Sequence, residues 1–141
     1  MPPQDDNVLT VKYPPGTKAH FLNLLSGTLG ADDKRWTLDK PLFCYSAKNQ
    51  KVFKTPAGST TDGCSVPRLP WIYAALGGRY HRSGALHDYI YRMSVCPRED
   101  CDNLLYEALV SEGCPPIRAE EMYLAVRAFG WQFYGSGGRQ A

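Results

Sequence analysis

The segment "GALHDYIYRM" (84–93) contains a histidine, an aspartate and a tyrosine whose spacing is suited to acid–base chemistry. On a helix, His87 and Tyr91 are four residues apart and share a face, whereas Asp88 points about a quarter of a turn away. An imidazole has a pKa near neutrality, so His87 can act as a general base. Asp88 is then left to bind something positive.

A general base works best when a carboxylate fixes its tautomer, and Asp88 is poorly placed to do so for its own neighbour. Asp102 is the best candidate. It lies one turn into the next predicted helix, and the short "SVCP" connection folds that helix back antiparallel beside the first. Asp100 is a weaker alternative, because its position at the helix start is already explained by the helix dipole.

Asp88 and the oxygen atoms of a nearby loop could also bind a cation. A hard cation such as calcium needs several oxygen ligands, and loops supply backbone carbonyls readily. Asp62 lies in the loop sequence "TPAGSTTDGCSVPRLPW", with Gly63 beside it to permit an unusual backbone turn. Asp62, Asp88 and loop carbonyls would make a sensible calcium site, although Asp62-Gly63 taken alone is more often an ordinary turn.

The first part of the chain, about residues 1–54, is predicted to form short β-strands. Leu9, Val11 and Tyr13 alternate with polar residues, as in a half-buried strand. Two more strands are expected at 36–45 and 51–54, joined by a turn at "SAKNQ", and residues 22–35 are expected to be loop. Residues 55–82 are rich in Pro, Gly, Ser and Thr, which favours an ordered functional loop.

Three helices are predicted over residues 83–134. The first covers 83–93 with Ser83 as a possible N-cap, the second begins near Pro97 and ends at Gly113, and the third begins at Pro115-Pro116. Their apolar stripes are Cys101, Leu104, Leu105, Ala108 and Leu109, then Ala119, Met122, Tyr123, Val126, Phe129 and Phe133. Residues 135–141 read as a flexible tail. The predicted fold is therefore a single α+β domain with a three-helix core.

The composition of the chain limits the classes of function that it can have. The 141 residues suit one compact domain, and a net charge of +2 is too weak to indicate a nucleic-acid partner. Neither a membrane span nor a signal peptide is visible, so we expect synthesis in a cytoplasm. Five cysteines without a CxxC pair favour reduced, mostly buried thiols over a zinc site.

The motifs in their order resemble a family of small bacteriophage and prophage proteins catalogued as a domain of unknown function. That family has a tryptophan-containing N-terminal strand, followed by "VPAGFxTDxASVPR", "HDxLY" and "RxxADxxF". Here the corresponding segments are Trp36, "TPAGSTTDGCSVPR" (55–68), "HDYIY" (87–91) and "REDCDNLL" (98–105). The resemblance extends over about residues 36–133.

The same segments resemble the secreted phospholipase A2 superfamily, most closely its bacterial branch, in which "TDGCS" precedes "HDxxYR". The resemblance implies that His87 is the general base that activates water and that Asp88 is a calcium ligand. It implies that Tyr91 and Asp102 orient the histidine, and that Asp62 and nearby loop carbonyls complete the calcium site.

The implied mechanism has calcium polarising an ester carbonyl while His87 takes a proton from the attacking water. Trp71, Ile72 and Tyr73 in "VPRLPWIY" would contact membrane phospholipid, or would instead cap the core. Arg92, at the end of "HDYIYR", is a further candidate for substrate contact.

The expected function is thus a calcium-dependent phospholipase A2-like hydrolase of the phage virion, carried in the tail and acting on the host envelope. Other tail proteins, and further copies of the chain, are the expected protein partners. Two alternatives remain open: a non-catalytic tail protein that retains the scaffold, and a metal-dependent hydrolase of another envelope ester or amide.

Overall fold

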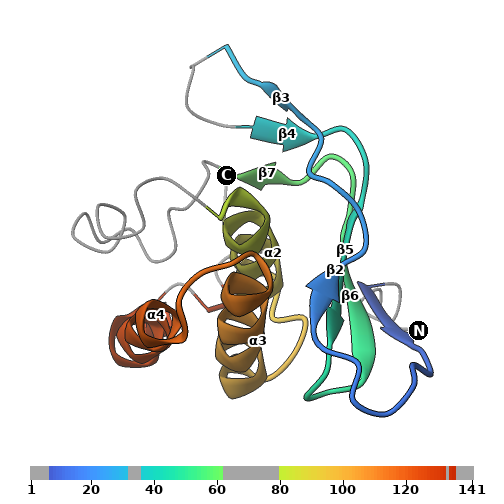
Figure 1. The fold of residues 1–141 in the computed structure, drawn as a ribbon. Helices are drawn as coiled ribbons and strands as arrows, with labels where there is room; N and C mark the ends of the chain where they lie inside the picture. Colours follow the sequence, from blue (N-terminus) through green and yellow to red (C-terminus); the bar gives the residue numbers. More distant parts are fainter. Residues whose placement is uncertain (1–6, 32–35, 62–79, 133, 136–141) are drawn as a thin grey trace.

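The computed structural model describes residues 7–31, 36–61, 80–132 and 134–135. Within them, short antiparallel strands are followed by helices, which confirms the predicted α+β class (Figure 1). The strands are β1 (Val8–Thr10), β2 (His20–Phe21), β3 (Gly27–Leu29), β4 (Trp36–Leu38), β5 (Leu42–Ser46), β6 (Lys51–Thr55) and β7 (Thr60–Thr61). The helices are α2 (His81–Arg92), α3 (Arg98–Ser111), α4 (Pro116–Phe129) and the 3-10 helix η2 (Gly130–Gln132).

The strands form two antiparallel sheets, with orders β1-β6-β5-β2 and β3-β4-β7. The β5–β6 hairpin turns at the predicted "SAKNQ" segment, where Ser46 pairs with Lys51. The Gln50 amide donates to the Ser46 carbonyl at 2.7 Å, which closes the turn. Gln50 reaches this geometry with a left-handed φ of 54°.

Three strand predictions were wrong in detail. The single strand expected over 36–45 is divided into β4 and β5, which belong to different sheets; Pro41, just before β5, has no amide for a ladder. Strand β3 lies within the segment 22–35 that was expected to be loop. Leu9 is 41% exposed, because the register of β1 on β6 turns Val8 toward the core instead.

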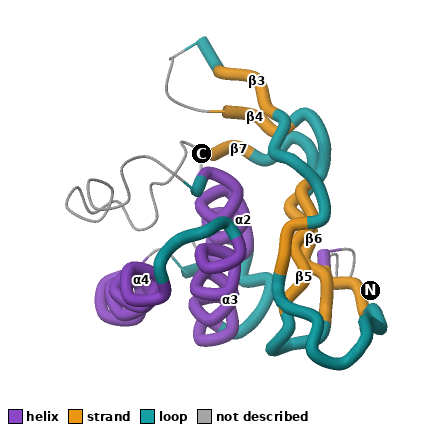
Figure 2. The backbone as a smooth tube through the Cα atoms, in the orientation of Figure 1, coloured by secondary structure: helices purple, strands orange, loops and turns teal. Residues whose placement is uncertain are grey.

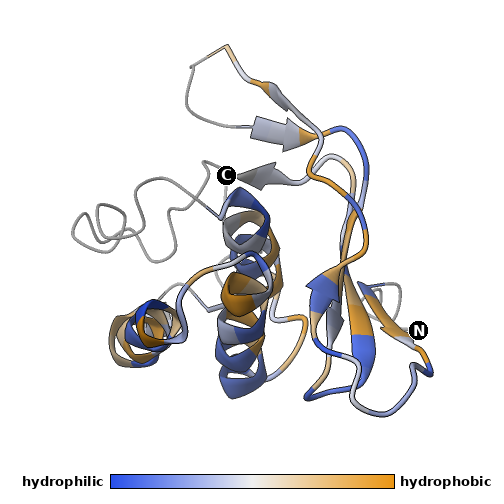
Figure 3. Cartoon of the chain, in the orientation of Figure 1, coloured by the Kyte–Doolittle hydropathy of each residue, from blue (hydrophilic) through white to orange (hydrophobic). Residues whose placement is uncertain are grey.

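The elements stack in layers. Helices α2 and α3 lie side by side against the four-stranded sheet, and α4 packs on α3 away from that sheet (Figures 1 and 2). Cys44 and Phe53 of the sheet meet Leu86, Ile90 and Leu104 of the helices in one buried cluster. A second cluster joins α3 to α4. Both helices of the middle layer carry hydrophobic and hydrophilic residues, as amphipathic helices do (Figure 3).

Helix α2 begins two residues earlier than predicted, and Ser83 is not its N-cap. The N-cap residue is Tyr80, in the left-handed region with φ 65°. Ser83 lies in the first turn, where its amide and hydroxyl both donate to Glu112 Oε1, at 3.0 and 2.7 Å. Arg82 Nε donates to Glu112 Oε2 at 2.8 Å. A carboxylate from the end of α3 thus performs the capping expected of Ser83.

The other helix boundaries agree closely with the prediction. Pro97 directly precedes α3, and Gly113 follows it with a φ of 97°. All five predicted stripe positions of α3 are buried. In α4, which begins at Pro116, Ala119, Met122 and Val126 are buried.

Phe129 was wrongly placed in the core. It is 49% exposed and is the last residue of α4, after which η2 begins. Phe133 lies outside the described residues. Gly135, expected to begin a flexible tail, donates its amide to the Tyr91 carbonyl at 2.9 Å. No helix in the described part of the chain is long and apolar enough to cross a membrane.

Candidate functional site

The fold brings His87 and Asp102 together in the interior. His87 Nε2 lies 3.3 Å from Asp102 Oδ1, and both side chains have no exposed surface. His87 comes from the middle of α2 and Asp102 from the second turn of α3, and the packing of these two helices sets the contact. The alternative partner, Asp100, instead lies in the first turn of α3 and lines a surface pocket.

Asp102 has a second partner that sequence reasoning missed. Arg127 Nη1, from the last turn of α4, donates to Asp102 Oδ2 at 2.8 Å. The Arg127 side chain is 35% exposed, so its cation is partly hydrated while the carboxylate is not. The two oxygens of Asp102 are thereby divided between an imidazole and a guanidinium, which compensates the buried negative charge.

The environment holds His87 neutral. Burial lowers the pKa of His87 below its ordinary value of 6.5; the hydrogen bond and charge of Asp102 oppose this shift, and the nearby cation of Arg98 adds to it. A carboxylate only accepts, so a neutral His87 must carry its proton on Nε2 and donate it to Asp102. Nδ1 then has the free lone pair. It is buried and has no hydrogen-bond partner among the described residues.

Tyr91 packs on the imidazole rather than bonding to it. The ring centroids of His87 and Tyr91 are 4.5 Å apart with an interplanar angle of 32°. The Tyr91 hydroxyl accepts a hydrogen bond from Arg98 Nε at 2.6 Å. Burial, the largest influence, raises the pKa of this phenol to about 12. Tyr91 therefore restricts the imidazole by contact, and a Cβ at Gly130 would lie only 2.8 Å from its hydroxyl oxygen.

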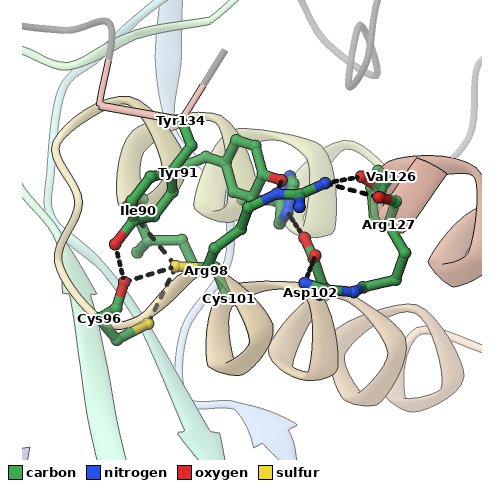
Figure 4. Close-up of polar contacts among 10 residues, drawn as sticks. Ile90, Tyr91, Cys96, Arg98, Cys101, Asp102, Val126, Arg127 and Tyr134 are labelled. Carbon is green, nitrogen blue, oxygen red and sulfur yellow. Dashed lines mark hydrogen bonds and ion pairs between the residues drawn. The ribbon is translucent and has the colours of Figure 1, made fainter. Parts of the chain in front are cut away.

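Arg98 connects all three helices at this point (Figure 4). Besides Tyr91 on α2, its Nη2 donates to the carbonyls of Val126 and Arg127 at 2.7 and 2.8 Å. These carbonyls lie at the C-terminal end of α4, where a cation is favourable, and the Val126 carbonyl also accepts from the Gly130 amide. Arg98 is the first residue of the motif "REDCDNLL", to which no role was assigned, and Arg127 lies in none of the motifs.

Asp88 faces away from His87, as its position on the helix predicts. Its Oδ2 accepts from Arg92 Nη2 at 3.3 Å, and the same Nη2 donates to the Thr60 carbonyl at 3.1 Å. Arg92 therefore joins α2 to β7, and Thr60 stands two residues before Asp62 in the sequence. Asp62 itself, with Gly63 and the proposed lipid contacts Trp71, Ile72 and Tyr73, lies outside the described residues.

Asp88 is the carboxylate next to His87 in the described part of the chain. The Asp88 side chain is 19% exposed and its charge is shared with Arg92. No group of three or more His, Cys, Asp or Glu side chains that could hold a metal ion occurs in the described part of the chain. Calcium takes six to eight oxygens, so Asp88 would need several further oxygen donors to complete a site.

Together the fold and the site define a small α+β protein whose three helices share a buried histidine–aspartate–arginine network. Its residues 36–126 match the family described as "Protein of unknown function (DUF1353)", and the chain belongs to that family. The expected membership of a family of unknown function is thus confirmed. The matched region contains His87 and Asp102 and ends one residue before Arg127.

One curated relative is the "Uncharacterized protein y4jT" of Sinorhizobium fredii (strain NBRC 101917 / NGR234), which is 28% identical over 90 residues. The match covers 62% of this chain but 27% of the relative, so the chain corresponds to about a quarter of that protein. No solved structure matches the chain.

Proposed function

We propose that the chain is a calcium-dependent, phospholipase A2-like ester hydrolase of a phage tail that acts on phospholipid of the host envelope. One observation carries the proposal: the neutral His87 donates from Nε2 to a buried carboxylate, which leaves Nδ1 as a proton acceptor. The residue pattern around "TDGCS" and "HDYIYR" supports the reaction class, and the same pattern supports the phage setting.

In this proposal, Nδ1 of His87 takes the proton of a water that attacks the ester carbonyl. As the imidazole becomes charged, Asp102 stabilises it through Nε2, and Arg127 holds the carboxylate in place. Tyr91 restricts the imidazole ring through their tilted ring contact. Because His87 has no exposed surface, the site must open before water and substrate reach Nδ1.

Asp88 is the described residue that would hold calcium, and Asp62 is the proposed second carboxylate. Asp88 fits this role in type and position, provided that it exchanges Arg92 for the metal. When bound, the metal would supply a positive charge for the developing oxyanion.

The activity test measures fatty acid released from phospholipid vesicles with and without calcium. The wild type should release fatty acid only with calcium, and His87→Ala should lower the rate by about 10²–10⁴-fold, the usual contribution of a general base. His81→Ala is the matched control, since His81 is an exposed histidine at the start of the same helix. Absence of calcium-dependent release by the folded wild type would refute the hydrolase.

A second function is favoured by one observation, the complete burial of His87. A non-catalytic tail protein would use the same network only to hold three helices together, as buried ionic groups often do. In that case His87→Ala would lower thermal stability while vesicle hydrolysis stays at the level of buffer. Mass spectrometry of purified phage particles would test the virion location that both functions require.

A further inference from the structure

Two cysteines at the start of α3 lie unusually close together. The sulfur atoms of Cys96 and Cys101 are 3.0 Å apart (Figure 4). This is about 1 Å more than the disulfide bond length of about 2.05 Å. Cys96 precedes Pro97, and Cys101 lies on the first turn of the helix that follows. A small movement would therefore bring the two sulfurs to bonding distance.

The backbone around the pair keeps the cysteines in these positions. The Cys101 amide donates to the Pro97 carbonyl at 3.0 Å, which fixes the first turn of α3. The Cys96 carbonyl accepts from the Tyr134 hydroxyl at 2.7 Å and from the Cys101 thiol at 3.3 Å. Hydrogen bonds of the backbone at both cysteines thus hold the two sulfur atoms close together.

The two thiols differ in their access to reagents. Cys101 has no exposed surface, and its sulfur also lies 3.7 Å from the Ile90 carbonyl. The contact with Cys96 and burial both raise the pKa of the Cys101 thiol. Cys96 is partly exposed and lines a surface pocket of about 500 Å³ together with Lys51 and Asp100. A small reagent therefore reaches Cys96 first.

We propose that Cys96 and Cys101 form an intramolecular disulfide when the protein meets a low-molecular-weight disulfide, with Cys96 as the attacking thiol and Cys101 as the resolving one. The Cys96 thiolate attacks one sulfur of the reagent, whose S–S bond breaks and releases one thiol. Cys101 then attacks the Cys96 sulfur in the mixed disulfide, and the second reagent thiol leaves with the Cys101 proton. The protein loses two hydrogen atoms and the reagent becomes two thiols.

The bond would close a ring through residues 96–101, which contains Arg98 and ends beside Asp102. It would tie the α2–α3 connection to the helix that carries these two residues. The inference rests on the cysteine geometry alone and holds whether or not the chain is a hydrolase.

The test oxidises the purified protein with oxidised glutathione, blocks remaining thiols with iodoacetamide, and digests it without reduction. Trypsin cleaves after Arg98, between the two cysteines, and a glutamate-specific protease separates Cys101 from Cys114 by cleaving after Glu107. The expected product is peptide 93–98 linked to peptide 100–107, and this product should disappear on reduction. Cys96→Ser should abolish it, whereas Cys44→Ser should leave it unchanged.

Three results would overturn the proposal. These are alkylation of both cysteines after the treatment with oxidised glutathione, a stable glutathione adduct on Cys96 with Cys101 still reduced, and a disulfide bond from either residue to a different cysteine. Peptide mapping of the wild type alone distinguishes these outcomes, so a variant that fails to fold does not affect the test.

Discussion

The two carboxylate oxygens of Asp102 bind two different partners, and this arrangement determines which nitrogen of His87 carries the proton. One oxygen accepts a hydrogen bond from His87 Nε2 and the other accepts one from Arg127. Without Arg127, a carboxylate with no exposed surface would have only a neutral imidazole as partner, which is unfavourable for a buried charge. The position of the His87 proton thus depends on a side chain twenty-five residues beyond Asp102.

The buried neutral state of His87 predicts an acid-sensitive stability. In the unfolded chain His87 titrates near 6.5, whereas its folded pKa is lower, so below about pH 6.5 the unfolded state binds more protons. Stability should be complete above that pH and fall as the pH drops toward the folded pKa. The slope from this residue is at most about 1.4 kcal/mol per pH unit. Urea titrations between pH 7.5 and 5 would measure it.

His87→Gln is the matched variant for this measurement, because a glutamine amide can still donate to Asp102 but does not titrate. The difference in unfolding free energy between wild type and variant should shrink as the pH falls below 6.5. A difference that stays constant over this range would show that His87 is not held neutral by the fold.

Asp102→Asn tests the charge at the centre of the network. The change keeps the shape but leaves Arg127 without its anion, and since the Arg127 cation is partly hydrated we expect a cost of about 1–3 kcal/mol, below that of breaking a fully buried pair. Asp100→Asn, only two residues away on the same helix, is the control and should change the unfolding free energy by less than about 1 kcal/mol. Equal effects of the two variants in urea denaturation would contradict the assignment of Asp102 as the buried partner.

At the scale of the elements, the end of α3 stabilises the start of α2. Glu112→Ala removes the acceptor of the Ser83 amide and hydroxyl and the partner of Arg82, so we expect a loss of about 1–3 kcal/mol of unfolding free energy. Glu121→Ala, at an exposed position of α4, should stay within about 0.5 kcal/mol. Thermal unfolding followed by circular dichroism would compare them, and similar midpoints would argue against the cap.

The helices could be predicted well from sequence because their boundaries depend on local chemistry. Pro97, Gly113 and Pro116 each act on the backbone where they stand, and α3 and α4 begin and end beside them. The start of α2 was missed by two residues because its cap comes from Glu112, twenty-nine positions beyond Ser83. Strand pairing is equally non-local, and for that reason β3 and the division between β4 and β5 were not predicted.

The residues of the candidate site also separate into those that local sequence could predict and those that it could not. The contact between His87 and Asp102 could be anticipated because a short connection makes α2 and α3 neighbours. Arg98 begins the motif "REDCDNLL", but its contacts with α4 could not be anticipated, and neither could Arg127, since both depend on the packing of α4 against α3. The positions of Asp62 and of the proposed lipid contacts 71–73 remain predictions.

At the scale of the whole molecule, the reactivity of the Cys44 thiol indicates whether the sheet and the helices remain in contact. It lies on β5 with no exposed surface, and burial, the largest influence, raises the pKa of its thiol. We expect Cys44 to resist iodoacetamide in the native protein and to react in urea as the sheet separates from α2 and α3. Cys96, which is partly exposed, should react in both conditions. Rapid native alkylation of Cys44, measured by peptide mass spectrometry, would mean that this core opens easily.

Helix α2 is bracketed by two residues in a conformation that non-glycine residues rarely adopt: Tyr80 before it at φ 65° and Ser94 after it at φ 52°. Each such residue costs roughly 1 kcal/mol relative to glycine. At both ends of α2, therefore, the natural residue is one that the backbone conformation disfavours, which makes these positions suitable for protein engineering. Ser94→Gly removes that cost but also removes the hydrogen bond between the Ser94 and Tyr134 side chains. Tyr80→Gly removes a ring that packs on the α3–α4 core. Glycine at either end thus changes the stability of the segment that carries His87 without altering the residues of the network.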